Sequence, residues 1–172
     1  PGYTGDKYRH FQAFDVSEAR ELLAQAGYPG GRGFPEMELW LKSQSPISPE
    51  GVAAQAIQQM LKENLRVDVN IRNMDRTTYE VEMKDWAIPM STLMFTYDFP
   101  DPHNMLSLVW HSQPKGYSRH DWKNPRFDSL VDEAVGTLDA DKRMAMYDEA
   151  ERILVEEAGG VFLWHVLDYQ LR

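Results

Sequence analysis

Apolar residues recur along the chain with two different periods, and these periods predict alternating helices and strands. The clearest helix is expected to begin at Asp15 and to end at Gly27, because apolar residues between them recur at spacings of three and four. Glu18, three residues after Asp15, gives the start of this helix the pattern of a capping box. Gly27 is the residue type that commonly ends a helix.

The same spacing predicts four further helices. One opens with Ser48 as its cap and Pro49 at its first helical position. Its expected buried face has five members: Ala53, Ala56, Ile57, Met60 and Leu61. The other three are expected to begin at these caps: Asp75, Asn124, and either Asp139 or Asp141.

Strict alternation of apolar and polar residues predicts a half-buried strand over residues 66–72. Shorter apolar runs predict three more strands: 37–41, 90–96 and 161–166. Strands that alternate with helices indicate an α/β fold in which helices cover a sheet. Residues 1–14 are interpreted as an irregular lead-in, and residues 15–172 as a single α/β lobe, because no linker divides them.

Composition narrows the classes of function. The chain of 172 residues carries 27 acidic and 18 basic side chains, a formal net charge of −9 with no basic stripe, which argues against a nucleic-acid partner. It has no cysteine, so disulfides and thiolate chemistry are excluded. No apolar run approaches the roughly 18 residues of a membrane span. The first residue is Pro1, and we expect the chain to be a fragment of a longer precursor.

The segment from Phe95 to Leu106 carries the strongest indication of a binding site. Asp101 precedes Pro102, and an Asp cap followed by Pro is an ordinary start of a helix. Asp98 has no such local role, and it lies between two aromatic residues at the expected end of a strand. Open α/β sheets bind their ligands at strand ends, and a carboxylate among aromatic rings is costly unless a cation pairs with it. Asp98 is therefore interpreted as half of a ligand site.

An ordered set of motifs resembles the oligopeptide/dipeptide-type (family 5) solute-binding proteins of ABC importers. Residues 15–28 are similar to the family's D-x-x-x-A-x-x-L-L-x-x-A-G-Y helix, and residues 98–102 resemble its D-Y-P-D-P segment. Later stretches resemble its F-H-S, Y-S, N-P-x-F-D and closing P-L-Y-H signatures: 110–112, 117–118, 124–128 and 162–165. Each motif is weak alone, whereas the ordered set is specific and covers nearly all of the chain.

The resemblance implies a fold and a place within a longer protein. The implied fold is an α/β lobe of the type II periplasmic-binding-protein class, with a mixed β-sheet of four or five strands covered by helices. Family members have two lobes, and this chain resembles the C-terminal part of the second lobe. Two such lobes close on a ligand by a hinge motion.

The resemblance also implies roles for four residues. Asp98 matches the position that receives the free α-ammonium of a bound peptide, and Phe95 matches an aromatic residue that lines the cleft. Thr96 and Tyr97 occupy strand-end positions whose backbone can hydrogen-bond an extended ligand. Some relatives carry an Arg for a ligand carboxylate where this chain has Thr92, so such a carboxylate must be bound elsewhere.

Two other kinds of site are weighed and set aside. The separations between His103, His111 and His120 fit no metal-ligand signature, so we expect no metal site. No G-x-S-x-G turn, P-loop or H-E-x-x-H motif occurs, and Asp101 is better explained as a cap than as the partner of Asp98 in hydrolysis. We expect no enzymatic activity and no cofactor.

The sequence thus predicts a binding lobe that captures peptides and delivers them to the permease subunits of an ABC importer. The alternatives are a binder of another small solute on the same scaffold (an oligosaccharide, an opine or a metal chelate) and an interaction or sensing module. We expect a monomer located outside the cytoplasm, either in the periplasm or anchored at the outer face of the cytoplasmic membrane.

Overall fold

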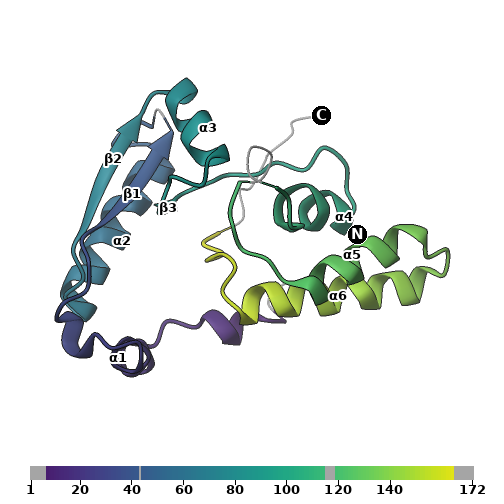
Figure 1. Ribbon diagram of the computed structural model, residues 1–172, viewed down its shortest axis with the longest axis horizontal. Coiled ribbons are helices and arrows are strands. Elements are labelled where there is room, and N and C mark those ends of the chain that lie inside the picture. The colour runs from purple at the N-terminus through teal and green to yellow at the C-terminus, as the bar shows by residue number, and fades with distance from the viewer. Residues whose placement is uncertain (1–6, 43, 115–118, 165–172) are drawn as a thin grey trace, which may run out of the picture. The chain divides into compact units, whose positions relative to one another are not determined.

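The computed structural model describes residues 7–42, 44–114 and 119–164, and these residues form two compact units (Figure 1). The sheet unit comprises residues 14–98 and the described part of 112–121. The helical unit comprises residues 7–13, 99–111 and 122–164. The prediction that residues 15–172 form one lobe stays a prediction.

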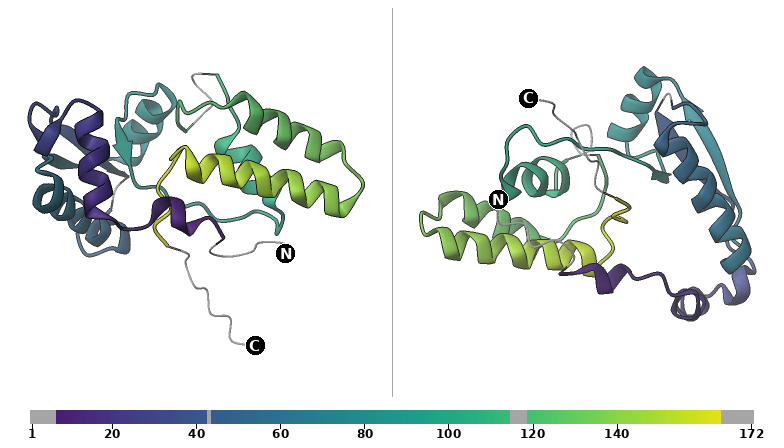
Figure 2. Two further views of the ribbon diagram at one scale, coloured as in Figure 1. Left: turned by 90° about the horizontal axis from the view of Figure 1, so that it is seen from below. Right: turned by 180° about the vertical axis from the view of Figure 1, so that it is seen from behind.

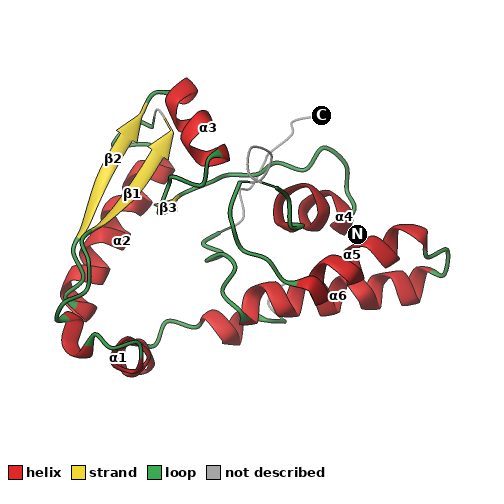
Figure 3. Cartoon of the chain, in the orientation of Figure 1, coloured by secondary structure: helices red, strands yellow, loops and turns green. Residues whose placement is uncertain are grey.

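The sheet unit is built from three strands and three α-helices, shown by type in Figure 3. Its elements are α1 (Val16–Gln25), the 3₁₀ turn η2 (Pro29–Gly31), β1 (Met37–Lys42), α2 (Pro49–Leu65), β2 (Val69–Met74), α3 (Arg76–Lys84) and β3 (Met90–Ser91). All three strands run parallel, in the order β2-β1-β3, so the sheet of the described residues is parallel where a mixed sheet was expected. The predicted α/β architecture, with helices against a sheet, is confirmed.

The predicted caps explain where these helices begin. The carboxylate of Asp15 accepts from the backbone N–H of Glu18 at 3.0 Å, and Ser48 Oγ accepts from that of Gly51 at 3.1 Å. Each bond satisfies one of the N–H groups that the first turn of a helix leaves unpaired. Asp75 caps α3 in the same way. These three predicted helix starts are confirmed.

The core of the sheet unit lies between the strands and α2, which runs along the sheet (Figure 1). Its buried members are Leu39, Leu41, Ala54, Val67 and Val69. Val67 and Val69 alternate with exposed Asp68 and Asn70, as the sequence predicts. The strand itself begins later than predicted, at Val69, because Arg66 is in the left-handed conformation (φ 57°) that ends α2.

Strand β3 is much shorter than the predicted strand over 90–96. Met90 and Ser91 pair with Leu39 and Trp40 of β1, and no described residue from 92 to 98 belongs to a strand. The apolar run that suggested a longer strand is not buried, since Leu93 is 44% and Met94 58% exposed. The pairing of β3 with β1 stops at Ser91 and Trp40, although β1 itself continues to Lys42, and a strand extends only as far as its ladder of hydrogen bonds does.

The helical unit is a pair of long helices with shorter turns packed against them. Figure 2 shows α5 (Pro125–Gly136) and α6 (Ala140–Glu156) side by side. The shorter elements are η1 (Arg9–Gln12), α4 (Pro102–Met105) and the π-helical turn η3 (Leu106–Trp110). Asn124 and Asp139 cap the long helices, as predicted. The buried core consists of Leu106, Phe127, Leu130, Val131, Ala134, Tyr147, Ala150, Ile153 and Leu154.

The first and the last described stretches of this unit both differ from the predicted secondary structure. Residues 7–13 include the 3₁₀ turn η1 and are bound to α6, where the Tyr8 hydroxyl and Lys7 Nζ both donate to Asp148 Oδ2, at 2.8 and 2.6 Å. Val161–Trp164 are described and belong to no strand, so the predicted strand over 161–166 is wrong there; residues 165 and 166 lie outside the described residues. Across the described ranges, no helix combines the length and apolarity needed to cross a membrane.

Candidate functional site

The topology of the sheet unit marks one edge of its sheet as the place for a ligand. Because the strands are parallel, the carboxyl ends of β1 and β3 lie at the same edge, toward which the arrowheads of β1 and β2 point in Figure 3. The chain goes from β1 to β2 on one side and then to β3 on the other, so the strand order reverses at β1. Open α/β sheets bind ligands outside the carboxyl ends of their strands at such a reversal.

A hollow of about 300 Å³ lies at this edge. It is formed by the end of β1, by α3, by the segment that follows β3 and by one residue of the 112–121 stretch, all within the sheet unit. Its lining residues are Lys42, Glu80, Met83, Lys84, Leu93, Met94, Phe95, Thr96 and Arg119. The volume is at the small end of the range for ligand pockets, roughly 300–1,000 Å³.

Two of the four predicted site residues line this hollow, and the other two follow them directly in the sequence. Phe95 and Thr96 are lining residues, and the ring of Tyr97 meets that of Phe95 edge-on, with centroids 6.1 Å apart. Asp98 is exposed and follows directly. The four residues belong to an irregular segment, so the prediction that Thr96 and Tyr97 end a strand is wrong.

The hollow contains charged groups that sequence reasoning missed. Lys42 Nζ lies 3.6 Å from a carboxylate oxygen of Glu80, and Arg76 Nε donates to the same oxygen at 2.9 Å. The hydrogen bond from Arg76 lowers the pKa of Glu80, so this carboxylate is ionised at neutral pH. The guanidinium carbon of Arg119 lies 5.3 Å from the centroid of the Phe95 ring. These residues are far apart in the sequence and form no motif, so only the fold identifies them.

Asp101 has a structural role in the helical unit. Its carboxylate caps α4 by accepting from the N–H of His103 at 2.9 Å. The same group accepts two hydrogen bonds from Arg143 of α6, at 2.9 and 2.7 Å, and these bonds hold the pKa of Asp101 below its ordinary value. The predicted cap is confirmed, and its ion pair with Arg143 joins α4 to α6.

The histidines of the helical unit pack against its helices. The ring of His103 lies 6.2 Å from that of Tyr147, and His111 Nε2 lies 3.1 Å from a carboxylate oxygen of Asp132. The ranges that the structure describes contain no group of three or more His, Asp or Glu side chains able to hold a metal ion. The expectation that no metal is bound stays a prediction.

Solved structures share this fold over most of the chain. The periplasmic oligopeptide-binding protein OppAIV from Borrelia burgdorferi aligns with a TM-score of 0.73 and 28% identity, covering 83% of this chain and 28% of that one. The periplasmic binding protein DppA from Helicobacter pylori, in complex with the peptide STSA, aligns with a TM-score of 0.76 and 26% identity, covering 91% and 30%.

These similarities and the arrangement of strands and helices define the class, an α/β lobe of the type II periplasmic-binding-protein kind, as predicted. The family follows from the sequence. Residues 1–117 match the bacterial extracellular solute-binding proteins, family 5 Middle, and the chain belongs to this family.

A curated relative shows how much of such a protein the chain represents. The oligopeptide-binding protein OppA of Bacillus subtilis is 28% identical over 160 residues, which is 91% of this chain. The chain spans only 29% of the length of that relative.

Proposed function

We propose that this chain is part of the ligand-binding lobe of an ABC-importer protein that captures peptides outside the cytoplasm and delivers them to membrane permease subunits. The observation that carries the proposal is the family match over residues 1–117, together with the similarity to a relative solved in complex with a peptide. The hollow at the ends of β1 and β3 supports it, because that edge of an α/β sheet is where ligands bind.

In this account the segment after β3 forms one wall of the peptide site. The carboxylate of Asp98 pairs with the α-ammonium of the peptide, and Phe95 contributes an apolar surface beside it. The backbone of Thr96 and Tyr97 hydrogen-bonds the main chain of the ligand. The irregular course of this segment supports that role, because its backbone groups are not committed to a sheet ladder.

The protein performs no chemistry in this account and acts as a monomer without metal or cofactor. Family 5 proteins and the relatives named above are binding proteins. The second wall of the site belongs to a part of the protein beyond this chain, and hinge closure of two lobes brings the walls together. The permease recognises the closed form, so the energy for transport comes from the partner.

A thermal-shift panel on the whole protein tests the class of ligand. A ligand that binds only the folded state raises the melting temperature, by an amount equivalent to about 2.7 kcal/mol at a ligand concentration 100 times its Kd. We expect di- to pentapeptides to raise the melting temperature, and oligosaccharides and opines at equal concentration to leave it unchanged. A shift with sugars alone would contradict peptide capture and favour the alternative solute on the same scaffold.

A further inference from the structure

The hollow at the ends of β1 and β3 is positively charged, although the chain as a whole is acidic. Among the described residues that line it, three carry cationic side chains (Lys42, Lys84 and Arg119) and one carries a carboxylate (Glu80). The chain carries a formal net charge of −9. A local excess of positive charge in an acidic protein is a feature that the fold creates, because these side chains come from β1, α3 and the 112–121 stretch.

The carboxylate of Glu80 does not neutralise this charge. Glu80 is shared between Lys42 and Arg76, at 3.6 and 2.9 Å. Among the described residues, no acidic side chain forms an ion pair with Arg119 or Lys84. Both side chains are exposed at the hollow, so both are open to an anion that enters it.

The Arg119 guanidinium lies beside an aromatic wall of the hollow. Its guanidinium group lies over the ring of Phe95, 5.3 Å from the centroid, and Phe95 is itself a wall of the hollow. A planar guanidinium can stack on an aromatic ring with one face and still present its N–H groups in the plane. Those N–H groups match a carboxylate in a bidentate pair, which is stronger than a hydrogen bond between neutral groups.

We infer that this hollow binds a carboxylate of the peptide, with Arg119 as its main partner and Lys84 as a second cation. The inference rests on the proposed function and adds the charge of the preferred ligand. Thr96 of the hollow and Asp98 are two residues apart, so their Cα atoms lie within about 7 Å. The carboxylate therefore belongs within the first two or three residues of the ligand, as an acidic side chain or as the terminus of a very short peptide.

Calorimetry on the whole protein with matched peptides tests this inference and separates the two sources of the carboxylate. One pair is Ala-Asp-Ala amide against Ala-Asn-Ala amide, and the other is Ala-Ala against Ala-Ala amide. In at least one pair we expect the acid to bind about tenfold more tightly. Arg119→Gln should reduce that preference to about threefold or less while the affinity for the amide stays within about twofold, because the variant removes a bond that only the acid makes.

Two further variants provide a control and separate the charge of Arg119 from its bidentate geometry. Arg32→Gln removes an exposed Arg of the same unit away from the hollow and should preserve the preference. Arg119→Lys keeps the charge but loses the bidentate geometry, so an intermediate preference is expected. An undiminished preference in Arg119→Gln, or an equal loss for acid and amide, would overturn the inference and leave peptide capture standing. Failure of every peptide to bind the unsubstituted protein would overturn both.

Discussion

At the scale of single residues, two acidic side chains three positions apart in the family's characteristic segment have different roles. Asp101 is tied to Arg143 and to the N-terminus of α4, so its role is structural. Asp98 is exposed and lies at the end of the segment that lines the hollow. The sequence distinguishes the two because Asp-Pro is a helix start, whereas the ion pair with Arg143 joins residues 42 positions apart and leaves no trace in the sequence.

Asp101→Asn isolates the contribution of the ion pair, because Asn is also a good N-cap. The pair is about one-third exposed, so after solvent screening we expect a loss of about 1 kcal/mol in the free energy of unfolding at pH 7. Urea unfolding followed by tryptophan fluorescence measures it. Glu133→Gln, which removes an exposed carboxylate of α5, is the control and should change stability by less than about 0.5 kcal/mol.

The effect of Asp101→Asn should depend on pH. Arg143 lowers the pKa of Asp101 in the folded state, so the ion pair contributes fully above the ordinary Asp pKa of about 3.9. Its contribution is lost as the pH falls through the lower folded-state pKa. The difference between the two proteins should therefore be constant from about pH 7 to pH 5 and shrink toward pH 3. A difference that grows on acidification would contradict this assignment.

At the scale of elements, local chemistry predicted where helices begin better than it predicted what they bury. The caps Asp15, Ser48 and Asn124 are all confirmed, because a cap depends on residues a few positions apart. The buried face of α2 is displaced from the predicted stripe: Met60 is 49% exposed, while Ala54 is fully buried. Which face a helix buries depends on the sheet it meets, and that contact is not local.

The same difference between local and non-local contacts explains which features of the strands were predicted correctly. The alternation around Val67 and Val69 correctly predicted which side chains are buried. The apolar run 93–95 predicted a strand over 90–96, whereas the strand in the structure ends at Ser91. The length of a strand depends on its pairing with another strand elsewhere in the chain, which the run itself does not specify. The hollow was likewise beyond prediction from sequence, since Lys42, Lys84 and Arg119 come together only through the fold.

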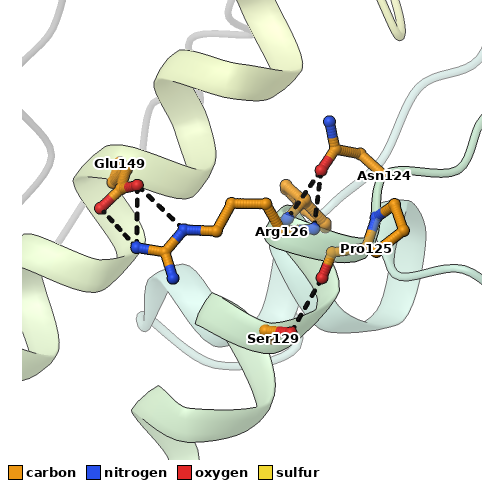
Figure 4. A network of polar contacts seen from close by, with 6 residues as sticks. Asn124, Pro125, Arg126, Ser129 and Glu149 are labelled. Carbon is orange, nitrogen blue, oxygen red and sulfur yellow. Dashed lines mark hydrogen bonds and ion pairs between the residues drawn. The ribbon is translucent and has the colours of Figure 1, made fainter.

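Asn124 is the N-cap of α5. Its side-chain oxygen accepts from the N–H groups of Arg126 and Phe127, both at 2.9 Å, while Arg126 reaches across to Glu149 of α6 (Figure 4). Asn124→Ala should cost about 1–2 kcal/mol of unfolding free energy, because it leaves both N–H groups without their acceptor. Asn124→Ser, which keeps a capping oxygen, should recover most of that loss in the same urea titration.

The ion pair between Arg126 and Glu149 in Figure 4 should contribute much less to the free energy of unfolding than the Asn124 cap does. Arg126 and Glu149 are 59% and 41% exposed, and exposed ion pairs are worth about 0–1 kcal/mol. Glu149→Gln should therefore destabilise the protein less than Asn124→Ala does. The reverse order would show that the contact between α5 and α6 is held by charge and not by the cap and the core.

At the scale of the whole molecule, the chain is an α/β lobe of the type II periplasmic-binding-protein kind and belongs to family 5 of the bacterial extracellular solute-binding proteins. The chain corresponds to 28–30% of the length of the relatives compared with it. Each of the two units has its own buried core. The order of motifs along the sequence predicted the family, and the family match over residues 1–117 confirms it.

The central claim is that the carboxylate of Asp98 pairs with the ammonium group of a bound peptide. A double-mutant cycle by calorimetry on the whole protein tests it, using one tripeptide with a free and with an acetylated amino end, against the unsubstituted protein and Asp98→Asn. Glu21→Gln, which removes an exposed carboxylate of α1, is the control and should leave both affinities unchanged. Acetylation alone and Asp98→Asn alone should each weaken binding about tenfold or more, and the two together should weaken it no further than either alone. An unchanged Kd for the free amine in Asp98→Asn, or two losses that multiply, would contradict the account.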